Sequence, residues 1–158
     1  MFNQKYIAAV IQLDTTTNYE QNLKAAADFI GEAHARGAKL VTLPENWTYQ
    51  GDDYLDYAEE MPGGRLAAML SELSAKYSMW IHSGSSSEKN PDPSDHRPYN
   101  TSMLFNPKGE LVAKYSKVHM FDVDIVGGGS FRESEHKCPG KEIVVYDTTV
   151  SYTHLTLP

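Results

Sequence analysis

Residues 6–13 read YIAAVIQL, a near-continuous apolar run with β-branched residues that is typical of a strand covered on both faces. A second apolar run, KLVTL, occupies residues 39–43. Between the two runs, apolar residues recur at helical spacing from Leu23 to Ala33. Strand, helix and strand joined by short links predict a βαβ unit, and therefore an α/β fold in which the two strands are parallel neighbours.

The residues at both ends of this helix are typical of helix caps. Asn18 and Gln21 approximate a capping box, and Gly37 suits the position just past the C-terminal end. Beyond residue 43 we expect one continuous α/β domain with these elements: a loop and a short helix at 46–61, a helix at 66–77, a strand at 79–84, a polar loop at 85–98, a hairpin of 99–105 with 110–115, an extended run at 117–124, a flexible glycine loop at 127–129 and a strand at 142–147.

The composition argues against several classes of partner. The chain has 158 residues, a net charge of −7 and no Lys/Arg cluster, so we expect no nucleic-acid partner. No apolar run approaches the length of a membrane span, so we expect no membrane partner. The six histidines lack metal-ligand spacing and glycines 127–129 do not begin a helix, so we expect neither a metal nor a nucleotide cofactor.

The single cysteine, Cys138, rules out an internal disulfide and is consistent with a reducing compartment, so we expect a cytoplasmic protein. It lies in the turn-like segment 136–140 (HKCPG), where no helix N-terminus is available to activate its thiol. We therefore interpret Cys138 as a loop cysteine and not as a nucleophile.

Glu45 is a candidate acid–base residue because it directly follows the apolar run at 39–43. Ligands of parallel α/β sheets bind outside the carboxyl ends of the strands. A carboxylate there, close to Trp47, is suited to general base work. From position alone, a solvated glutamate at a strand end is the alternative.

Lys117 enters an apolar, strand-like run and can point a fixed cation at a developing oxyanion. The alternative is a surface lysine whose stem covers Tyr115 or Phe121. His119 invites the role of a base or metal ligand, but a histidine in such a run more often satisfies a local hydrogen bond.

Several segments, in order along residues 5–148, resemble the nitrilase superfamily of carbon–nitrogen hydrolases. The opening strand (AAVIQL) is similar to theirs, residues 37–46 (GAKLVTLPEN) resemble the segment with the catalytic glutamate, and residues 99–109 resemble the hairpin before the catalytic lysine. The most specific match is 114–124 (KYSKVHMFDVD), which resembles the amidase branch that includes ω-amidase and deaminated-glutathione amidase. The stretch from Glu133 to Gly140 resembles the one that holds a second active-site glutamate.

The resemblance implies a Glu-Lys-Cys hydrolase of small linear amides, with residues 1–148 as the N-terminal part of a four-layer αββα sandwich. Glu45 would take the proton of the nucleophilic thiol and later activate water. Lys117 would hold the oxyanion, and Glu133 would position Lys117 and the substrate. The resemblance also implies a small amide as the partner, no cofactor, and a homo-oligomer in the full-length form. A nitrilase or an N-carbamoyl amidohydrolase is the alternative within the same class.

The sequence departs from the family after Asp147, where a strand with the nucleophilic cysteine belongs. Residues 149–158 (TVSYTHLTLP) contain no cysteine, and we interpret them as a tail foreign to the fold. We therefore expect no amidase activity from this chain. The alternative function is that of a truncated subunit that only folds or associates. Because helices are expected on one side of the sheet only, we also expect the other face to be apolar and exposed.

Overall fold

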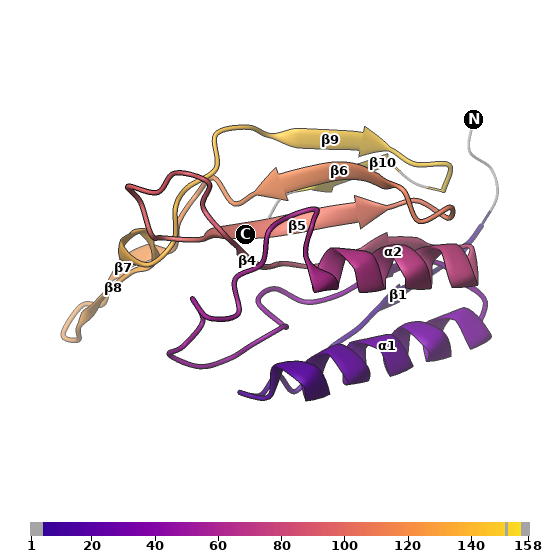
Figure 1. Ribbon diagram of the computed structural model, residues 1–158, viewed down its shortest axis with the longest axis horizontal. Helices are drawn as coiled ribbons and strands as arrows, with labels where there is room; N and C mark the ends of the chain where they lie inside the picture. The colour runs from indigo at the N-terminus through magenta and orange to yellow at the C-terminus, as the bar shows by residue number, and fades with distance from the viewer. Residues whose placement is uncertain (1–4, 151, 156–158) are drawn as a thin grey trace.

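The βαβ unit predicted at the start of the chain is present in the computed structural model, which describes residues 5–150 and 152–155. Strand β1 (Ile7–Val10) pairs in parallel with β2 (Ala38–Thr42), and helix α1 (Tyr19–Ala35) connects them (Figure 1). The side chain of Asn18 accepts a hydrogen bond from the backbone N–H of Gln21 at 3.0 Å, and Gly37 has a φ of 82°. Both caps are therefore formed where the sequence predicts them.

Four further strands extend this pair into a mixed sheet. Strand β3 (Trp80–His82) is parallel to β2, and β5 (Tyr99–Phe105) runs antiparallel to β3. Strand β4 (Ser86–Glu88) pairs with the same edge of β5, and β6 (Leu111–Ser116) pairs with the other edge. Since β6 is antiparallel to β5, it runs in the direction of β2 and β3. The C-terminal ends of β2, β3 and β6 therefore meet the start of β5 at one end of the sheet.

Two small hairpins complete the structure. Strands β7 (Asp122–Asp124) and β8 (Ser130–Arg132) pair around the glycine segment 127–129 and project beyond the strand ends of the main sheet (Figure 1). The short 3₁₀ helix η1 (Glu133–Glu135) follows them. Strand β9 (Val144–Asp147) then pairs in antiparallel fashion with β10 (Tyr152–Leu155).

The main core lies between one face of the sheet and helices α1 and α2 (Arg65–Tyr77). It consists mainly of the following buried side chains: Leu23, Ile30, Val41, Leu66, Leu70, Ile81, Met103 and Phe105. None of the helices among the described residues is both long enough and apolar enough to cross a membrane.

The second face of the sheet is covered in part, which corrects two expectations. Trp80, Leu104 and Tyr115 are buried in a second cluster that includes residues of β9, so this region is not exposed. Strand β1, in contrast, is not covered on both faces. It is an edge strand, and the side chain of Val10 is 82% exposed. The cluster that covers the second face includes no residue of β1, and an apolar run alone does not reveal how far a neighbouring layer extends.

Three local predictions were also wrong. Residues 46–61 form turns and no helix, because Tyr57 stacks on Tyr49 (ring centroids 4.1 Å apart) and on Tyr19 (5.4 Å) and so fixes the segment through tertiary contacts. The polar loop at 85–98 contains strand β4, where buried Glu88 pairs with Lys114 at 2.5 Å. The extended run at 117–124 is a strand only in β7.

Candidate active site

The turn after β2 that carries Glu45 is fixed against the turn after β3. The backbone N–H of Asn46 (φ 51°) donates to Ser85 Oγ at 3.1 Å, and the N–H of Ser85 donates to the carbonyl of Pro44 at 3.1 Å. Gly84 has a φ of 62°, and a Cβ there would lie 2.0 Å from the Pro44 oxygen. Only glycine allows the two turns to approach so closely, and this contact sets the position of Glu45.

Lys117 follows the last residue of β6 at the same end of the sheet. Its Nζ lies 3.1 Å from Glu45 Oε1 and 3.0 Å from Glu133 Oε2, and its side chain is only 6% exposed. Lys117 is therefore not a surface lysine. Burial lowers the pKa of Lys117, but the hydrogen bonds to Glu133 and Glu45 outweigh it, so its pKa lies above the ordinary lysine value. The ammonium group is thus held in its charged form.

The two carboxylates differ in how they are held. Glu133 begins η1, its Oε2 accepts the backbone N–H of Phe121 at 2.7 Å, and its side chain is 11% exposed. Glu45 is 32% exposed and accepts a hydrogen bond from Asn100 Nδ2 at 2.7 Å. Glu45 is therefore the carboxylate with access to solvent and ligands, whereas Glu133 is tied to the fold. Sequence reasoning placed Asn100 in a hairpin but did not single it out as a site residue.

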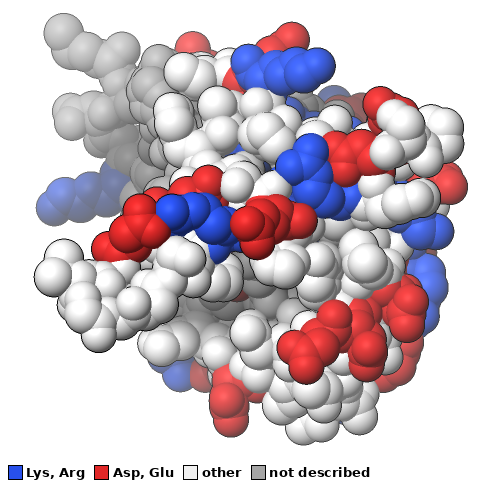
Figure 2. All heavy atoms as spheres, turned by 90° about the vertical axis from the view of Figure 1, so that its left-hand side faces the viewer, with Lys and Arg blue, Asp and Glu red and all other residues white. Residues whose placement is uncertain are grey.

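A pocket of about 870 Å³ opens over these groups, and Glu45, Lys117 and Glu133 all line it. Aromatic side chains from the 46–61 segment and from the β7–β8 hairpin form much of the wall, together with charged residues: Tyr49, Asp52, Tyr54, Phe121, Phe131 and Lys137. Figure 2 shows this end of the molecule, where acidic and basic side chains interleave in a band beside a hollow in the surface.

Lys137 is a second lysine of the pocket, and sequence reasoning missed it because its neighbours form only a polar turn. The residue is 9% exposed, its Nζ donates to Ser87 Oγ at 2.6 Å, and the ammonium lies 4.6 Å from the centroid of the Tyr54 ring. Burial lowers the pKa of Lys137 to about 8, although the charge of Glu133 opposes the shift.

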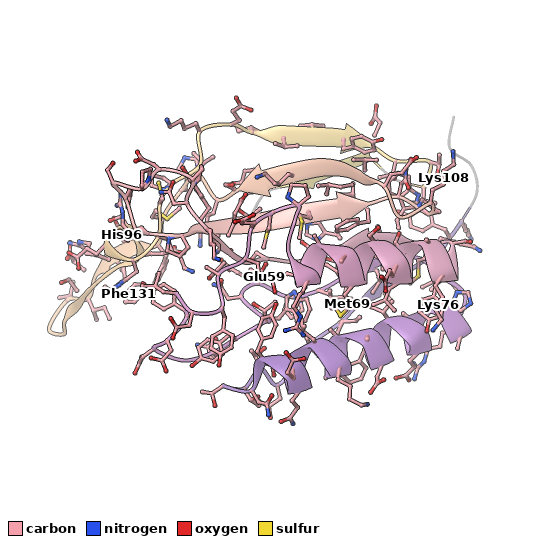
Figure 3. All side chains as sticks on the ribbon, viewed as in Figure 1. Glu59, Met69, Lys76, His96, Lys108 and Phe131 are labelled. Atoms are coloured by element: carbon pink, nitrogen blue, oxygen red, sulfur yellow. The ribbon has the colours of Figure 1, made fainter. Side chains whose placement is uncertain are left out.

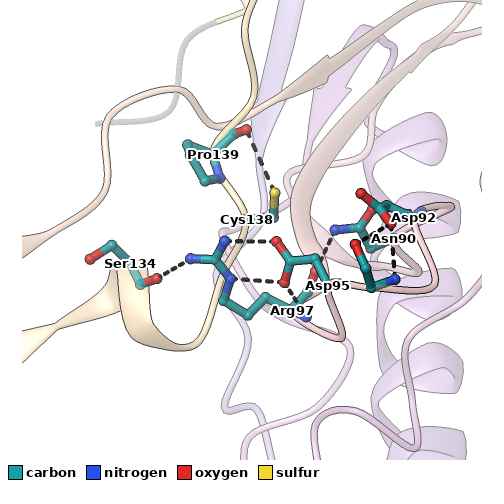
Figure 4. A network of polar contacts seen from close by, with 8 residues as sticks. Asn90, Asp92, Asp95, Arg97, Ser134, Cys138 and Pro139 are labelled. Atoms are coloured by element: carbon teal, nitrogen blue, oxygen red, sulfur yellow. Dashed lines mark hydrogen bonds and ion pairs between the residues drawn. The ribbon is translucent and has the colours of Figure 1, made fainter.

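Cys138 and His119 do not belong to this site. Cys138 is absent from the pocket lining, and its Sγ lies 4.0 Å from the carbonyl oxygen of Pro139 (Figure 4). Beside it, Arg97 pairs with Asp95 at 2.7 Å. His119 is exposed. Within residues 5–150 and 152–155, no group of three or more His, Cys, Asp or Glu side chains could hold a metal ion.

The arrangement provides a fixed cation beside an accessible carboxylate. A lysine ammonium has three N–H donors, and the two carboxylates engage two of those of Lys117. No other hydrogen bond or ion pair of the Lys117 ammonium is found among the described residues, so a third donor is available to a ligand oxygen in the pocket. Glu45, at the same place, can exchange a proton with a group bound there.

Comparison with known proteins gives consistent matches. A family model described as carbon–nitrogen hydrolase matches residues 7–155. The chain is 40% identical over 152 residues to the chloroplastic omega-amidase of Arabidopsis thaliana, covering 92% of this chain and 40% of that protein. It is 38% identical over 142 residues to omega-amidase NIT2 of Homo sapiens, covering 89% of this chain and 50% of that protein. The chain thus spans half, or less, of the length of these relatives.

Two solved structures share the fold. The C. elegans NitFhit protein superimposes with a TM-score of 0.78 at 29% identity, over 93% of this chain and 36% of that one. Saccharomyces cerevisiae Nit3, described as a member of branch 10 of the nitrilase superfamily, superimposes with a TM-score of 0.73 at 30% identity, over 92% of this chain and 52% of that one.

Proposed function

The chain belongs to the carbon–nitrogen hydrolase family, and we propose that it carries the acid–base part of an active site that hydrolyses small linear amides. The observation that supports this most directly is the charged Lys117 held between Glu45 at 3.1 Å and Glu133 at 3.0 Å in the wall of a pocket. The relatives named omega-amidase support a narrower substrate class, the ω-amides.

Each of the three residues has a role that follows from its surroundings. Glu45 is the general base, because it is the more exposed carboxylate and can take the proton of a nucleophile. Lys117 offers its remaining N–H to the amide oxygen as negative charge develops there. Glu133 is a positioning residue, since its bonds to Lys117 and to the backbone of Phe121 fix the direction of the ammonium.

The complete reaction needs a thiolate. It attacks the amide carbon to form a C–S bond, the C–N bond breaks, and ammonia leaves with a proton returned by Glu45. Water activated by Glu45 then hydrolyses the thioester. Cys138 is the single cysteine of this chain and lies outside the pocket lining, so we propose that the chain by itself binds amides without turning them over. A subunit that only folds or associates is the competing function.

Two measurements on the purified chain test this proposal. Calorimetric titration with succinamate, the monoamide of succinic acid, should show binding that Glu45→Gln weakens and that Glu72→Gln, at an exposed position on α2, leaves unchanged. Ammonia release from succinamate should stay at background. Absence of binding by the folded chain would refute the proposed site. Turnover that disappears in Glu45→Gln would show that the chain is a complete enzyme.

A further inference from the structure

The pocket contains two buried lysines, and only one of them has a carboxylate partner. Lys117 is paired with two glutamates. Among the described residues, no carboxylate oxygen lies within ion-pair distance of Lys137 Nζ, which is held by the hydroxyl of Ser87 and the ring of Tyr54. Lys137 is 9% exposed, so its charge is neither neutralised by an anion of the fold nor fully hydrated.

An uncompensated ammonium in a pocket wall is suited to binding an anion. A buried charge costs free energy unless a counter-charge is present, and a ligand carboxylate would supply one. The lowered pKa of Lys137, about 8, reflects the same cost. The lysine is also preorganised, because its backbone N–H donates to the carbonyl of Glu133 at 2.8 Å while Ser87 and Tyr54 hold the head group.

The pocket has space for a ligand with two polar ends. Its volume, about 870 Å³, exceeds what a simple amide fills, and Phe121 and Phe131 add apolar wall for a short methylene chain. We infer that Lys137 binds the carboxylate end of the substrate while the amide end lies at Lys117 and Glu45, so that the site selects anionic over neutral amides. This assignment rests on the proposed function and makes Lys137 its specificity-determining residue.

The test compares two ligands of equal length, succinamate with its carboxylate and neutral butyramide, by calorimetric titration. The variants are Lys137→Met and, as the matched control, Lys108→Met. Lys108 is an exposed lysine at the opposite end of the molecule from Phe131 (Figure 3). The unmodified chain should bind succinamate at least about tenfold more tightly than butyramide, since a hydrogen bond to a charged group contributes roughly this factor or more.

Lys137→Met should abolish this preference and leave butyramide affinity unchanged, while Lys108→Met should retain it. If Lys137→Met weakens both ligands equally, or neither, the assignment is overturned and the lysine is structural. Equal affinity of the unmodified chain for both ligands also overturns it, but leaves the proposed function intact. Failure of the unmodified chain to bind either ligand overturns both.

A pH titration gives a second test of the assignment. Affinity for succinamate should fall roughly tenfold from pH 7 to 9.5, as Lys137 loses its proton, while affinity for butyramide stays level. The other titratable groups that line the pocket are Glu45, Tyr49, Asp52, Tyr54, Lys117, Glu133 and His136. A change in their charge also acts on an anionic ligand, so the control is Lys137→Met titrated with succinamate, which should show no such fall. A level profile for succinamate overturns the assignment.

Discussion

Replacement of Lys117 by methionine tests how strongly the ion-pair network holds the site together. The methionine side chain fills similar space but leaves Glu45 and Glu133 close together without the cation that now lies within 3.1 Å of both. Removal of one partner of a buried ion pair costs about 3–5 kcal/mol. Glu133, at 11% exposure, would bear this cost, whereas Glu45, at 32%, can recover hydration. We therefore expect the free energy of unfolding to fall by about 3 kcal/mol at pH 7, the lower end of that range.

Urea unfolding measures this change through the fluorescence of Trp47 and Trp80, which are both buried. For a slope of about 2 kcal/mol per molar urea, the midpoint should fall by about 1.5 M. The double variant Lys117→Met/Glu133→Gln should recover about 1–2 kcal/mol, because the second change removes one of the uncompensated charges. Lys108→Met, at an exposed position, should stay within about 0.5 kcal/mol of the unmodified chain.

The reasoning would be refuted by a loss below about 1 kcal/mol in Lys117→Met, since a buried ion pair should cost more. It would also be refuted by a double variant no more stable than the single one. Either result would mean that hydration or a local rearrangement compensates the carboxylates once the ammonium is removed.

Three further predictions follow from burial and backbone geometry. Burial lowers the pKa of Lys137 to about 8, so the charged form of this side chain opposes folding below that pH. In thermal or urea unfolding, the free energy of unfolding should therefore rise by up to about 3 kcal/mol between pH 8 and 10.5, and Lys137→Met should not show this rise. Burial lowers the pKa of His82 from 6.5 to about 4. The contribution of neutral His82 to stability should therefore be complete above pH 6.5, and the free energy of unfolding should fall by up to about 3 kcal/mol as the pH drops to 4. His82→Asn should remove most of this pH dependence, whereas an unchanged pH dependence would mean that other groups cause it. Gly84→Ala should lower the free energy of unfolding by about 2 kcal/mol or more, because the new Cβ meets the Pro44 carbonyl at a positive φ; a stability equal to that of the unmodified chain would show that the turn beside Glu45 can relax.

The half-buried His82 also shows how the second face of the sheet is organised. Nδ1 of His82 lies 2.7 Å from Thr42 Oγ1, and Nε2 lies 2.8 Å from Ser102 Oγ, so the ring connects β2 and β5 through β3. A neutral imidazole can donate at one nitrogen and accept at the other, which satisfies both hydroxyl contacts. The pH dependence predicted for His82 therefore also tests whether its two hydroxyl contacts hold this face of the sheet together.

The sequence by itself determined the elements whose signals are local. Helical spacing with Asn18 and Gly37 at its ends defined α1, and the turn chemistry at 106–109 defined the hairpin of β5 and β6. Short segments similar to a known family also identified Glu45, Lys117 and Glu133 as site candidates. These signals depend on neighbours within a few residues, so they can be interpreted without knowledge of the fold.

The tertiary structure alone decided which of these groups meet. Glu45 and Lys117 are separated by 72 residues, and they lie 3.1 Å apart because two antiparallel pairings turn β6 back into the direction of β2. The role inferred for Lys137 likewise depends on Ser87 and Tyr54, which are distant in sequence. Burial, ion pairing and pKa shifts arise from contacts between distant segments, and periodicity and capping carry no information about such contacts.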